Sequence, residues 1–507
     1  MGLLKIRRSI SGLMARLRGA DESFVHTRTP QAAVQQSGGR GDRSDRRRAH
    51  RRDGAPPRSG GTPRRRQPEV PQRYRIGRDA HTVSDTDISA NALKVLRRLN
   101  EAGYQAFLVG GGVRDVLLAL HPKDFDVATD ATPDEVRALF RNCRLIGRRF
   151  RLAHVFFGRE IIEVATFRAP HREGESPAGL TRGKVEHVGL TENGRILRDN
   201  VYGTLEDDVW RRDLSINALY YDIADGAIVD YVGGLEDIER RLIRLLGDPL
   251  VRYREDPVRL IRVVRFAAKL DFSIAPETAQ PLTELGHLLA DVPPARLFEE
   301  VGKLFLGGCG VAVLRQLQRY DLLRFLFPET TDSLAQDTTG VAESFLIEAL
   351  RNTDERVAQG KPVTPGFLFA ALLWAPVRQA VGCRGADDPM RYREVGFQVL
   401  DAACRSVVVP RRYQSDIREI WEMQPRFERR AGKRAQRLAG HPRFRAAYDF
   451  LCVRAAAGDA DPALCQWWTA FQQGAPPPVT GPDEVADRPR RRRRRRPRRA
   501  AGSNRSE

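Results

Sequence analysis

The sequence contains no apolar run that approaches the roughly 18 residues of a membrane-spanning helix. Its first 17 residues also lack the continuous apolar segment of a secretory signal, because lysine and arginine interrupt the leucines. This stretch can be a mitochondrial presequence or an irregular basic arm, and the acidic pair Asp21-Glu22 favours the arm. A myristoylation pattern also fails, since position 6 is isoleucine. We therefore expect no membrane partner.

Cysteine is scarce, with six residues among 507. They are scattered at positions 143, 309, 383, 404, 452 and 465. No two of them have the close spacing of a zinc-binding or redox-active pair. We therefore expect buried, reduced thiols and a cytoplasmic location.

The middle of the chain has no excess charge of either sign, although the whole sequence carries +20. Residues 76–480 hold 55 basic and 55 acidic side chains, whereas residues 1–75 hold 19 against 6 and residues 481–507 hold 11 against 4. The terminal segments have too few apolar residues to bury a core. We predict a disordered basic arm over 1–80 and a disordered arginine-rich tail over 476–507, both able to attract a polyanion.

The sequence does contain an apolar, strand-like run, Phe107–Gly110, which leads into Gly111, Gly112 and Arg114 and then into a helical pattern. The backbone N–H groups of such a turn and of the helix start can bind an anion, with Arg114 close by. Taken alone, three consecutive glycines would indicate no more than a tight turn.

Two aspartates, Asp124 and Asp126, follow in the segment Lys123–Val127. On a strand, alternate side chains share a face, so both carboxylates would point the same way and Phe125 would point to the core. Adjacent carboxylates repel unless a cation lies between them, and a pair of Mg²⁺ ions with bound phosphates is the usual solution. Alone, this can be an exposed edge strand. After the glycine turn, it predicts a site for a nucleoside triphosphate and metal.

Around these segments the pattern predicts a small mixed sheet flanked by helices over 84–234. Folding is expected to begin near Val83, with a helix over 88–103. Thr132-Pro133 starts another helix, with threonine as cap and proline in the first turn. Further strands are expected at 145–148, 152–158 and 161–167, with a hairpin at 220–232.

Glu163 lies on the last of those three strands, between Ile162 and Val164. A carboxylate in this place can be a third metal ligand or simply the polar face of an edge strand. The polar, glycine-rich residues 169–200 then predict a mobile loop beside the site.

A second polar cluster occupies Arg211–Asn217. Arg212 can hold a triphosphate, Asn217 can hydrogen-bond a sugar or base, and Asp213 can complete a metal triad. Taken alone, the same residues would indicate a structural salt-bridge cluster.

Helical periodicity dominates from residue 235, and we predict a helical nucleotide-recognition neck over 235–300. In it Asp256 precedes Arg259 by three residues, and Arg262 and Arg265 follow at further steps of three, on one side. An aspartate with an arginine can read a base edge, and arginines also reach phosphate. The alternative is a solvated charged face of a surface helix.

A helical RNA-binding body is predicted over 301–475, which makes the fold class α+β: an α/β head with a small mixed sheet, then an all-α body. Helices are expected around 294–306, 311–326, 341–352, 366–380, 391–405, 413–424 and 441–455. Basic residues lie close to aromatic residues near its end, namely Lys433, Arg434, Arg437, Arg443 and Arg445 beside Phe444, Tyr448, Trp467 and Trp468. These aromatics can belong to an RNA-facing surface or to the core.

Four segments, in this order, resemble the bacterial branch of the class II nucleotidyltransferases, which add untemplated nucleotides to RNA 3′ ends. They are a Gly-Gly-x-x-Arg turn, an Asp-x-Asp strand, an Arg-Arg-Asp-x-x-x-Asn segment and a Glu-Asp-x-x-Arg helix, at 111–114, 124–126, 211–217 and 255–259. Within the family, the chain is similar to the poly(A)-synthesising members over about residues 84–475, in KDFDVATDATP, FRNCRLIGRRFRLAHV and RYREDPVRLIRVVRFAAKL.

The resemblance implies that Asp124, Asp126 and Asp213 are the catalytic carboxylates, with the first two as metal ligands and Glu163 as a supporting candidate. It implies a set of nucleotide-binding residues, namely Gly111, Arg114, Arg212, Asp256, Arg259, Arg262 and Arg265. Two Mg²⁺ ions would assist in-line attack of the RNA 3′-hydroxyl on ATP, with release of pyrophosphate. The implied partners are ATP, the 3′ ends of mRNA and small RNA, and the RNA-decay machinery.

Two other functions stay open at this point. A CCA-adding tRNA nucleotidyltransferase would use CTP as well as ATP and stop after a fixed number of additions. The chain lacks the C-terminal His-Asp phosphohydrolase-type region of some such enzymes. A non-catalytic RNA-binding adaptor would need only the arginine-rich segments, and the intact Asp124, Asp126 and Asp213 count against it.

Overall fold

The computed structural model describes residues 71, 74–147, 151–169, 201–430 and 432–474. The chain forms two compact units, one up to Leu326 and one from Phe327. The boundaries predicted at 234 and 300 both fall within the first unit. The predicted loop over 170–200, the tail from 475 and the arm up to residue 70 lie outside the described residues.

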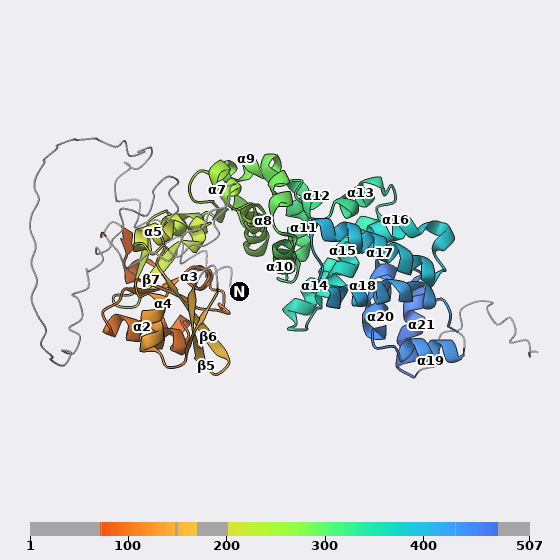
Figure 1. The fold of residues 1–507 in the computed structure, drawn as a ribbon, viewed down its shortest axis with the longest axis horizontal. Helices are drawn as coiled ribbons and strands as arrows, with labels where there is room; N and C mark the ends of the chain where they lie inside the picture. The colour runs from red at the N-terminus through yellow and green to blue at the C-terminus, as the bar shows by residue number, and fades with distance from the viewer. Residues whose placement is uncertain (1–70, 72–73, 148–150, 170–200, 431, 475–507) are drawn as a thin grey trace, which may run out of the picture. The chain divides into compact units, whose positions relative to one another are not determined.

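An eight-stranded mixed sheet is the centre of the head (Figure 1). Its strands are β1 Arg75–Ile76, β2 Ala106–Val109, β3 Asp126–Thr129, β4 Cys143–Ile146, β5 Leu152–Phe157, β6 Glu160–Thr166, β7 Leu219–Asp222 and β8 Ala227–Asp230. They are ordered β1-β8-β7-β2-β3-β6-β5-β4, and only β3 and β6 pair in parallel. The three predicted strands and the 220–232 hairpin are confirmed with small shifts of their ends.

Helices and short 3₁₀ turns surround this sheet, and they start where the sequence supplies caps. They are η2 Arg78–Ala80, η3 Asp85–Asp87, α2 Ala90–Glu101, α3 Gly111–Leu117, α4 Pro133–Leu139, α5 Leu205–Trp210, η5 Ser215–Asn217 and α6 Gly234–Glu239. Ser89 caps α2, and Thr132 caps α4 in a reciprocal pair with Glu135. The apolar side chains of α2, such as Leu96 and Leu99, are fully buried.

The ordered fold begins earlier than predicted, so the expected disordered arm over 1–80 is wrong for its last residues. Strand β1 pairs antiparallel with β8, with Arg75 opposite Val229. Arg75 also forms ion pairs with Asp222 at 2.9 Å and Asp225 at 2.6 Å. These partners are more than 140 residues away in sequence, and for this reason local composition did not reveal the strand.

The predicted strand through both aspartates is also wrong at its start, because β3 begins at Asp126 and leaves Asp124 before it. The neighbouring strand β2 ends at Val109, opposite Asp126. There the chain turns away at Gly110, whose φ is 72°. Residues before Asp126 therefore have no β2 backbone to pair with.

The neck is helical, as predicted, with one additional small sheet. Its elements are β9 Leu242–Ile243, α7 Pro249–Glu255, α8 Val258–Leu270, β10 Ser273–Ile274, α9 Pro276–Leu285, η6 Gly286–Asp291, α10 Pro294–Phe305, α11 Gly310–Arg319 and α12 Leu323–Leu326. Helix α8 buries Leu260, Val263 and Val264 and packs against α10 and α11. Its arginines therefore lie on the opposite side.

The second unit is all-α. Its elements are α13 Pro328–Gln336, α14 Val341–Ala358, α15 Pro365–Leu372, α16 Trp374–Gly385, α17 Pro389–Ser406, α18 Arg411–Met423, η7 Gln424–Arg426, α19 Lys433–Ala439, α20 Phe444–Ala456 and α21 Pro462–Gln472. The helices predicted at 311–326 and 366–380 are each two helices, separated at 320–322 and at Leu373. Helices α13, α19 and α21 were not predicted. The α+β fold class is confirmed.

The aromatic residues near the end of this unit belong to its core. Phe444, Tyr448, Trp467 and Trp468 are each at most 9% exposed and pack in one cluster with Phe427. Trp468 stays buried because its indole N–H donates to the Phe427 carbonyl at 3.0 Å. The alternative of an RNA-facing surface built on these rings is therefore wrong.

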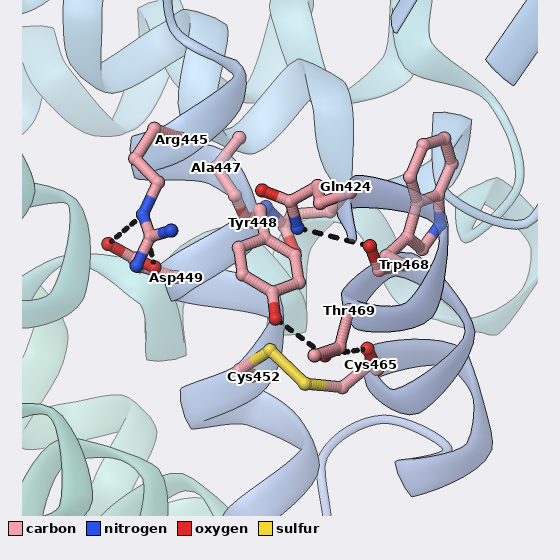
Figure 2. Close-up of a disulfide and its surroundings, with 10 residues drawn as sticks. Gln424, Arg445, Ala447, Tyr448, Asp449, Cys452, Cys465, Trp468 and Thr469 are labelled. Atoms are coloured by element: carbon pink, nitrogen blue, oxygen red, sulfur yellow. Dashed lines mark hydrogen bonds and ion pairs between the residues drawn. A yellow bond between two sulfur atoms is a disulfide. The ribbon is translucent and has the colours of Figure 1, made fainter. Parts of the chain in front are cut away.

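The expectation of six free thiols is wrong for two cysteines. Cys452 on α20 and Cys465 on α21 form a disulfide with a Cα–Cα distance of 5.3 Å (Figure 2). Beside it, the hydroxyls of Tyr448 and Thr469 lie 2.6 Å apart. A helical hairpin brought together two residues whose separation in sequence resembled no known pair spacing.

Among the described residues, no single helix has the length and apolar composition of a membrane span. The bent pair Pro365–Leu372 and Trp374–Cys383, which meets at 54°, passes the same criteria only when the two helices are taken together.

Candidate active site

The glycine turn brings three parts of the sequence together. Gly110 is buried with φ 72°, and a Cβ there would lie 3.4 Å from an Arg212 guanidinium nitrogen. A Cβ on Gly112 would lie 3.5 Å from both the Asp124 carbonyl and the Phe125 ring. The turn therefore needs glycine at 110 for its backbone conformation, and the small residues let the acidic segment pack closely against α3.

The carboxylates lie where β3 meets β6. Asp126 pairs with Glu163 in the parallel register of these strands, so the two residues are direct neighbours on the sheet. Although Asp126 is exposed, desolvation of its carboxylate and the charges of Glu163 and Asp124 raise its pKa to about 6, against the opposing charge of Arg212. This edge of the sheet holds negative charge that the protein's own cations do not neutralise.

Glu163 also has a basic neighbour, since its Oε2 lies 3.4 Å from Nε2 of His154 on β5. Asp124, Asp126 and Glu163 offer only hard oxygen donors. Within the described ranges, no group of three or more histidine, cysteine, aspartate or glutamate side chains is arranged to hold a metal. Two carboxylates completed by substrate phosphates and water are nevertheless a typical Mg²⁺ donor set.

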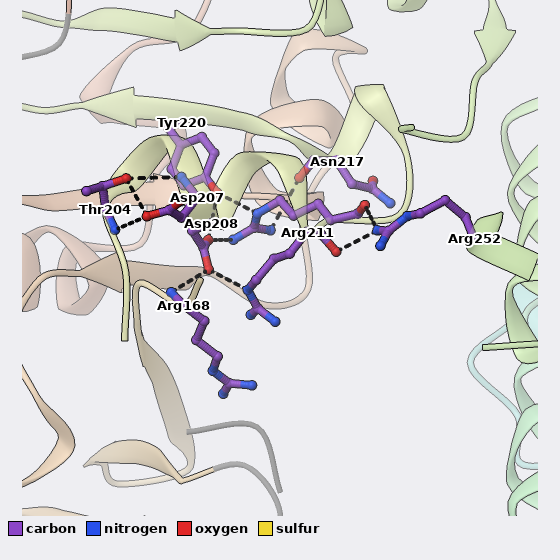
Figure 3. A network of polar contacts seen from close by, with 9 residues as sticks. Arg168, Thr204, Asp207, Asp208, Arg211, Asn217, Tyr220 and Arg252 are labelled. Atoms are coloured by element: carbon purple, nitrogen blue, oxygen red, sulfur yellow. Dashed lines mark hydrogen bonds and ion pairs between the residues drawn. The ribbon is translucent and has the colours of Figure 1, made fainter. Parts of the chain in front are cut away.

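Asp208, which sequence reasoning did not single out, organises the second polar cluster (Figure 3). It is 2% exposed and accepts hydrogen bonds from Arg211 Nε at 2.9 Å, Arg212 at 3.0 Å and the Tyr220 hydroxyl at 2.7 Å. Its other donor is the backbone N–H of Arg168 at 3.3 Å. Burial alone would raise the pKa of Asp208, but the two arginines and Tyr220 hold it well below its usual range.

The same cluster fixes Arg212. Its Nε donates to the Tyr220 hydroxyl at 2.6 Å, and its guanidinium carbon lies 4.9 Å from the centre of the Tyr220 ring. A second nitrogen donates to the Asn217 carbonyl at 3.3 Å. Arg212 is thus held against the Gly110 turn and acts electrostatically on Asp126.

Arg114 is the buried end of the glycine motif. It is 3% exposed, and it donates hydrogen bonds to the side chains of Asn217 and Asp115. Its guanidinium carbon lies 5.1 Å from the centre of the Phe266 ring, and Arg265 lies 4.8 Å from the same ring. The head motif therefore meets helix α8 of the neck through Phe266.

Asp213 lies on this head-to-neck side and not with Asp126. Its carboxylate pairs with Arg262 at 2.6 Å, and its other oxygen accepts from Leu214 N–H at 2.9 Å and from the Asn217 amide at 3.5 Å. Burial works against the charged form, but Arg262 and Asn217 outweigh it, and the pKa of Asp213 is lowered. The charges that act on Asp126 come from Glu163, Arg212 and Asp124.

The predicted aspartate–arginine pair of the neck is arranged differently from the expected steps of three. Asp256 lies between α7 and α8 and pairs with Arg296 on α10 at 2.8 Å. Arg259 instead donates to Glu255 at 2.8 Å and to the Arg252 carbonyl at 2.7 Å. A one-sided pattern of four residues on one helix is therefore wrong for Asp256, because the helix starts after it.

Two further residues of this site were missed. Arg252 donates to the carbonyls of Arg211 and Arg212 at 2.8 and 2.7 Å and so ties α7 to the head (Figure 3). Arg296 is the ion-pair partner of Asp256. Both bonds join residues about 40 positions apart. Of the signals available in the sequence, only the acidic pair preceding Arg211 pointed to this network.

A glycine turn beside an oxygen-rich sheet edge, with buried arginines from head and neck, defines the nucleotidyltransferase class. Models of the poly A polymerase head domain, of the probable RNA and SrmB-binding site of polymerase A and of the polymerase A arginine-rich C-terminus match residues 106–244, 271–334 and 392–500. Poly(A) polymerase I of Salmonella typhimurium is 50% identical over 421 residues, 82% of this chain and 89% of that protein. The chain belongs to the bacterial poly(A) polymerase I family and is a polynucleotide adenylyltransferase.

Relatives with the other family activity match less of the chain. The CCA-adding enzyme of Bacillus pumilus is 41% identical over 217 residues, 43% of this chain and 50% of that enzyme. The solved CCA-adding enzyme of Thermotoga maritima complexed with tRNA has a TM-score of 0.51 at 18% identity, over 76% of this chain and 83% of that one. That likeness shows the common fold.

Proposed function

We propose that this enzyme transfers AMP from ATP to RNA 3′ ends without a template, using Asp124 and Asp126 as its central carboxylates. The observation that carries the proposal is the register of β3 and β6, which sets Asp126 against Glu163 and leaves their negative charge uncompensated beside the glycine turn. Such an edge attracts a divalent cation together with a polyphosphate.

The residues fit Mg²⁺ by their donor chemistry, since Asp124 and Asp126 supply hard carboxylate oxygens. When bound there, Mg²⁺ would lower the pKa of the RNA 3′-hydroxyl and offset the charge of the triphosphate. The hydroxyl oxygen then forms a bond to the α-phosphorus of ATP, and the bond to the pyrophosphate leaving group breaks. Asp124 and Asp126 orient the reacting groups, and Glu163 adjusts the protonation of Asp126.

Arginines from both sides of the site serve the triphosphate. Arg212 is held at the turn by Asp208 and Tyr220, so it is ordered before substrate binds. The Nε groups of Arg262 and Arg265 are buried and donate no hydrogen bond to any described residue. Such donors favour an anionic ligand. Arg114 and Asn217 position the Gly111 turn.

Asp213 is a positioning residue in this proposal, because its carboxylate orients Arg262 and Asn217. The pair Asp256 and Arg296, with Arg259 nearby on α8, forms the base-recognition group. An ion pair there presents both a carboxylate acceptor and guanidinium donors to a base edge.

The proposed test uses purified enzyme, Mg²⁺, an unstructured RNA primer and each NTP separately, resolved on a denaturing gel. Long heterogeneous ladders with ATP and little product with CTP are expected. Extension that requires CTP and stops after a few nucleotides would overturn the proposal in favour of CCA addition. No extension with RNA binding intact would favour an adaptor.

We also propose a cytoplasmic location with RNA 3′ ends and the RNA-decay machinery as partners. Cys143, Cys309, Cys383 and Cys404 carry free thiols, as the reducing cytoplasm favours. The Cys452–Cys465 bond runs against that pattern. Alkylation of the enzyme in freshly lysed cells, followed by mass spectrometry, measures how much of this pair is bonded in the cell.

A further inference from the structure

The second unit contains a cavity that no part of the proposed mechanism uses. It has a volume of about 290 Å³ and lies between α17 and α18, with His441 at one side. Phe397, Arg393, Arg418 and Arg426 contribute to its lining. All of these residues belong to the second unit, whereas the carboxylate site belongs to the first.

Phe397 is the aromatic residue of this cavity, and it is 49% exposed. The guanidinium carbon of Arg418 lies 4.0 Å from the centre of its ring. Gly396 permits this arrangement, because a Cβ there would lie 3.2 Å from the Trp421 ring and 3.4 Å from the Arg418 side chain. The close approach of α17 and α18 at Gly396 thus sets an aromatic face and a guanidinium plane side by side in an open position.

The cationic side chains around Phe397 are only loosely paired. Arg393 and Arg426 each approach Glu422 no closer than 3.9 and 3.8 Å, beyond hydrogen-bond distance. No carboxylate pairs with Arg418 in the part of the chain that the structure describes. The guanidinium groups can therefore turn to an incoming phosphate at little cost.

Two carboxylates and one histidine complete the list of titratable groups. Glu419 lies 3.9 Å from Arg443, which pairs more closely with Asp416 at 2.6 Å. His441 Nδ1 accepts the backbone N–H of Arg443 at 3.2 Å. Carboxylates repel phosphate, so Glu419 and Glu422 exclude a simple polyanion pocket. They do accept hydrogen bonds from an exocyclic amino group, which adenine has and uracil lacks.

We propose that this cavity binds one nucleotide of single-stranded, adenine-containing RNA. The base stacks on Phe397 between the ring and Arg418, its amino group faces Glu422 or Glu419, and the flanking phosphates lie against Arg393 and Arg426. The proposal rests on the proposed function, since it assumes that the enzyme acts on RNA and produces poly(A). It adds a tail-binding subsite outside the catalytic unit.

The test compares the affinity of the full-length enzyme for fluorescent A20 and U20 oligonucleotides by anisotropy at fixed salt. Phe397→Ala is expected to weaken A20 binding roughly fivefold to tenfold, since stacking on one aromatic contributes that much or more. Met390→Ala is the matched control, because Met390 is also an exposed apolar residue of α17, 64% exposed, and does not line the cavity. The control is expected to bind like the wild type.

Two further arms locate the contacts. Arg418→Ala should weaken A20 and U20 binding, whereas Arg405→Ala, another exposed arginine of α17, should weaken neither. Glu422→Ala should reduce the preference for A20 over U20. Unchanged A20 affinity in Phe397→Ala, with normal thermal unfolding, would overturn the proposal and leave the cavity to a protein partner or to no ligand.

Failure of this inference can be separated from failure of the proposed function. In the same preparations, the rate with ATP and saturating short primer measures catalysis alone, and Phe397→Ala should keep it within about twofold while KM for A20 rises. A wild-type enzyme that extends no primer would contradict the proposed function. A wild-type enzyme that extends primers, with all variants equal to it in A20 affinity, would contradict only the subsite.

Discussion

Asp126 and Asp208 are carboxylates of the same head with opposite environments. Asp208 is buried, yet Arg211, Arg212 and Tyr220 surround it, and its pKa lies well below the usual range. Asp126 is exposed, yet desolvation and its acidic neighbours raise its pKa to about 6. Exposure therefore does not decide the charge state of a carboxylate here; the partners supplied by the fold do. The satisfied group supports the structure, and the unsatisfied group is free to do chemistry.

The largest expected effect comes from removing the unsatisfied charge. Asp126→Asn should lower polymerisation by about a thousandfold, or roughly 4 kcal/mol of transition-state stabilisation. The same change should raise the melting temperature of the metal-free enzyme at neutral pH, because a carboxylate with a raised pKa costs stability when ionised. Primer extension and calorimetry measure the two effects, and a loss of both activity and stability would contradict the comparison.

Removal of the satisfied charge should act in the other direction. Asp208→Ala leaves Arg211 and Arg212 without their buried partner, and it should lower the free energy of unfolding by about 3 kcal/mol. Urea denaturation of the head measures this loss. Because the pKa of Asp208 is lowered, its contribution is present above the unfolded pKa near 4 and is lost as the pH falls below it. The Asp208→Ala variant should therefore lose less stability than the wild type in acid.

The pH dependence of activity should sharpen the difference further. At limiting Mg²⁺, the rate should fall severalfold as the pH drops through about 6, because Asp126 takes up a proton that competes with the cation. A higher Mg²⁺ concentration should shift this acid limb to lower pH. A limb that does not move with Mg²⁺ would show that another group controls it.

The smallest effect is expected from the neighbour of Asp126. Glu163→Gln removes one of the charges that raise the pKa of Asp126, so the acid limb should move to lower pH. At pH 8, where Asp126 is ionised in both proteins, the rate should stay within about twofold. A loss of roughly a hundredfold at pH 8 would identify Glu163 as a metal ligand instead.

Local features of the fold were predictable because their causes lie within a few residues. Thr132 and Pro133 start α4 as expected, and Asp225-Gly226 turns the β7–β8 hairpin. The glycine turn also lies where the apolar run ends. In each case the cap, the first-turn proline or the turn residue defines its own conformation.

The remaining features depend on residues far apart in sequence. Asp124 is left off β3 because its potential partner strand turns at Gly110. Asp256 pairs with Arg296, and Asp213 pairs with Arg262, through the packing of the neck on the head. Spacing along a chain carries no information about such pairs. The roles proposed for these residues stay predictions until the variants are measured.

The disulfide between α20 and α21 changes the connectivity of the chain as well as its packing. Residues 452–465 form a closed covalent ring, with the two cysteines 13 positions apart. A protease that cuts once inside this ring adds one water molecule to the mass but releases no fragment until a reductant is present. On a denaturing gel without reductant, nicked and intact enzyme would therefore run as one band, and a single cut here would go unnoticed.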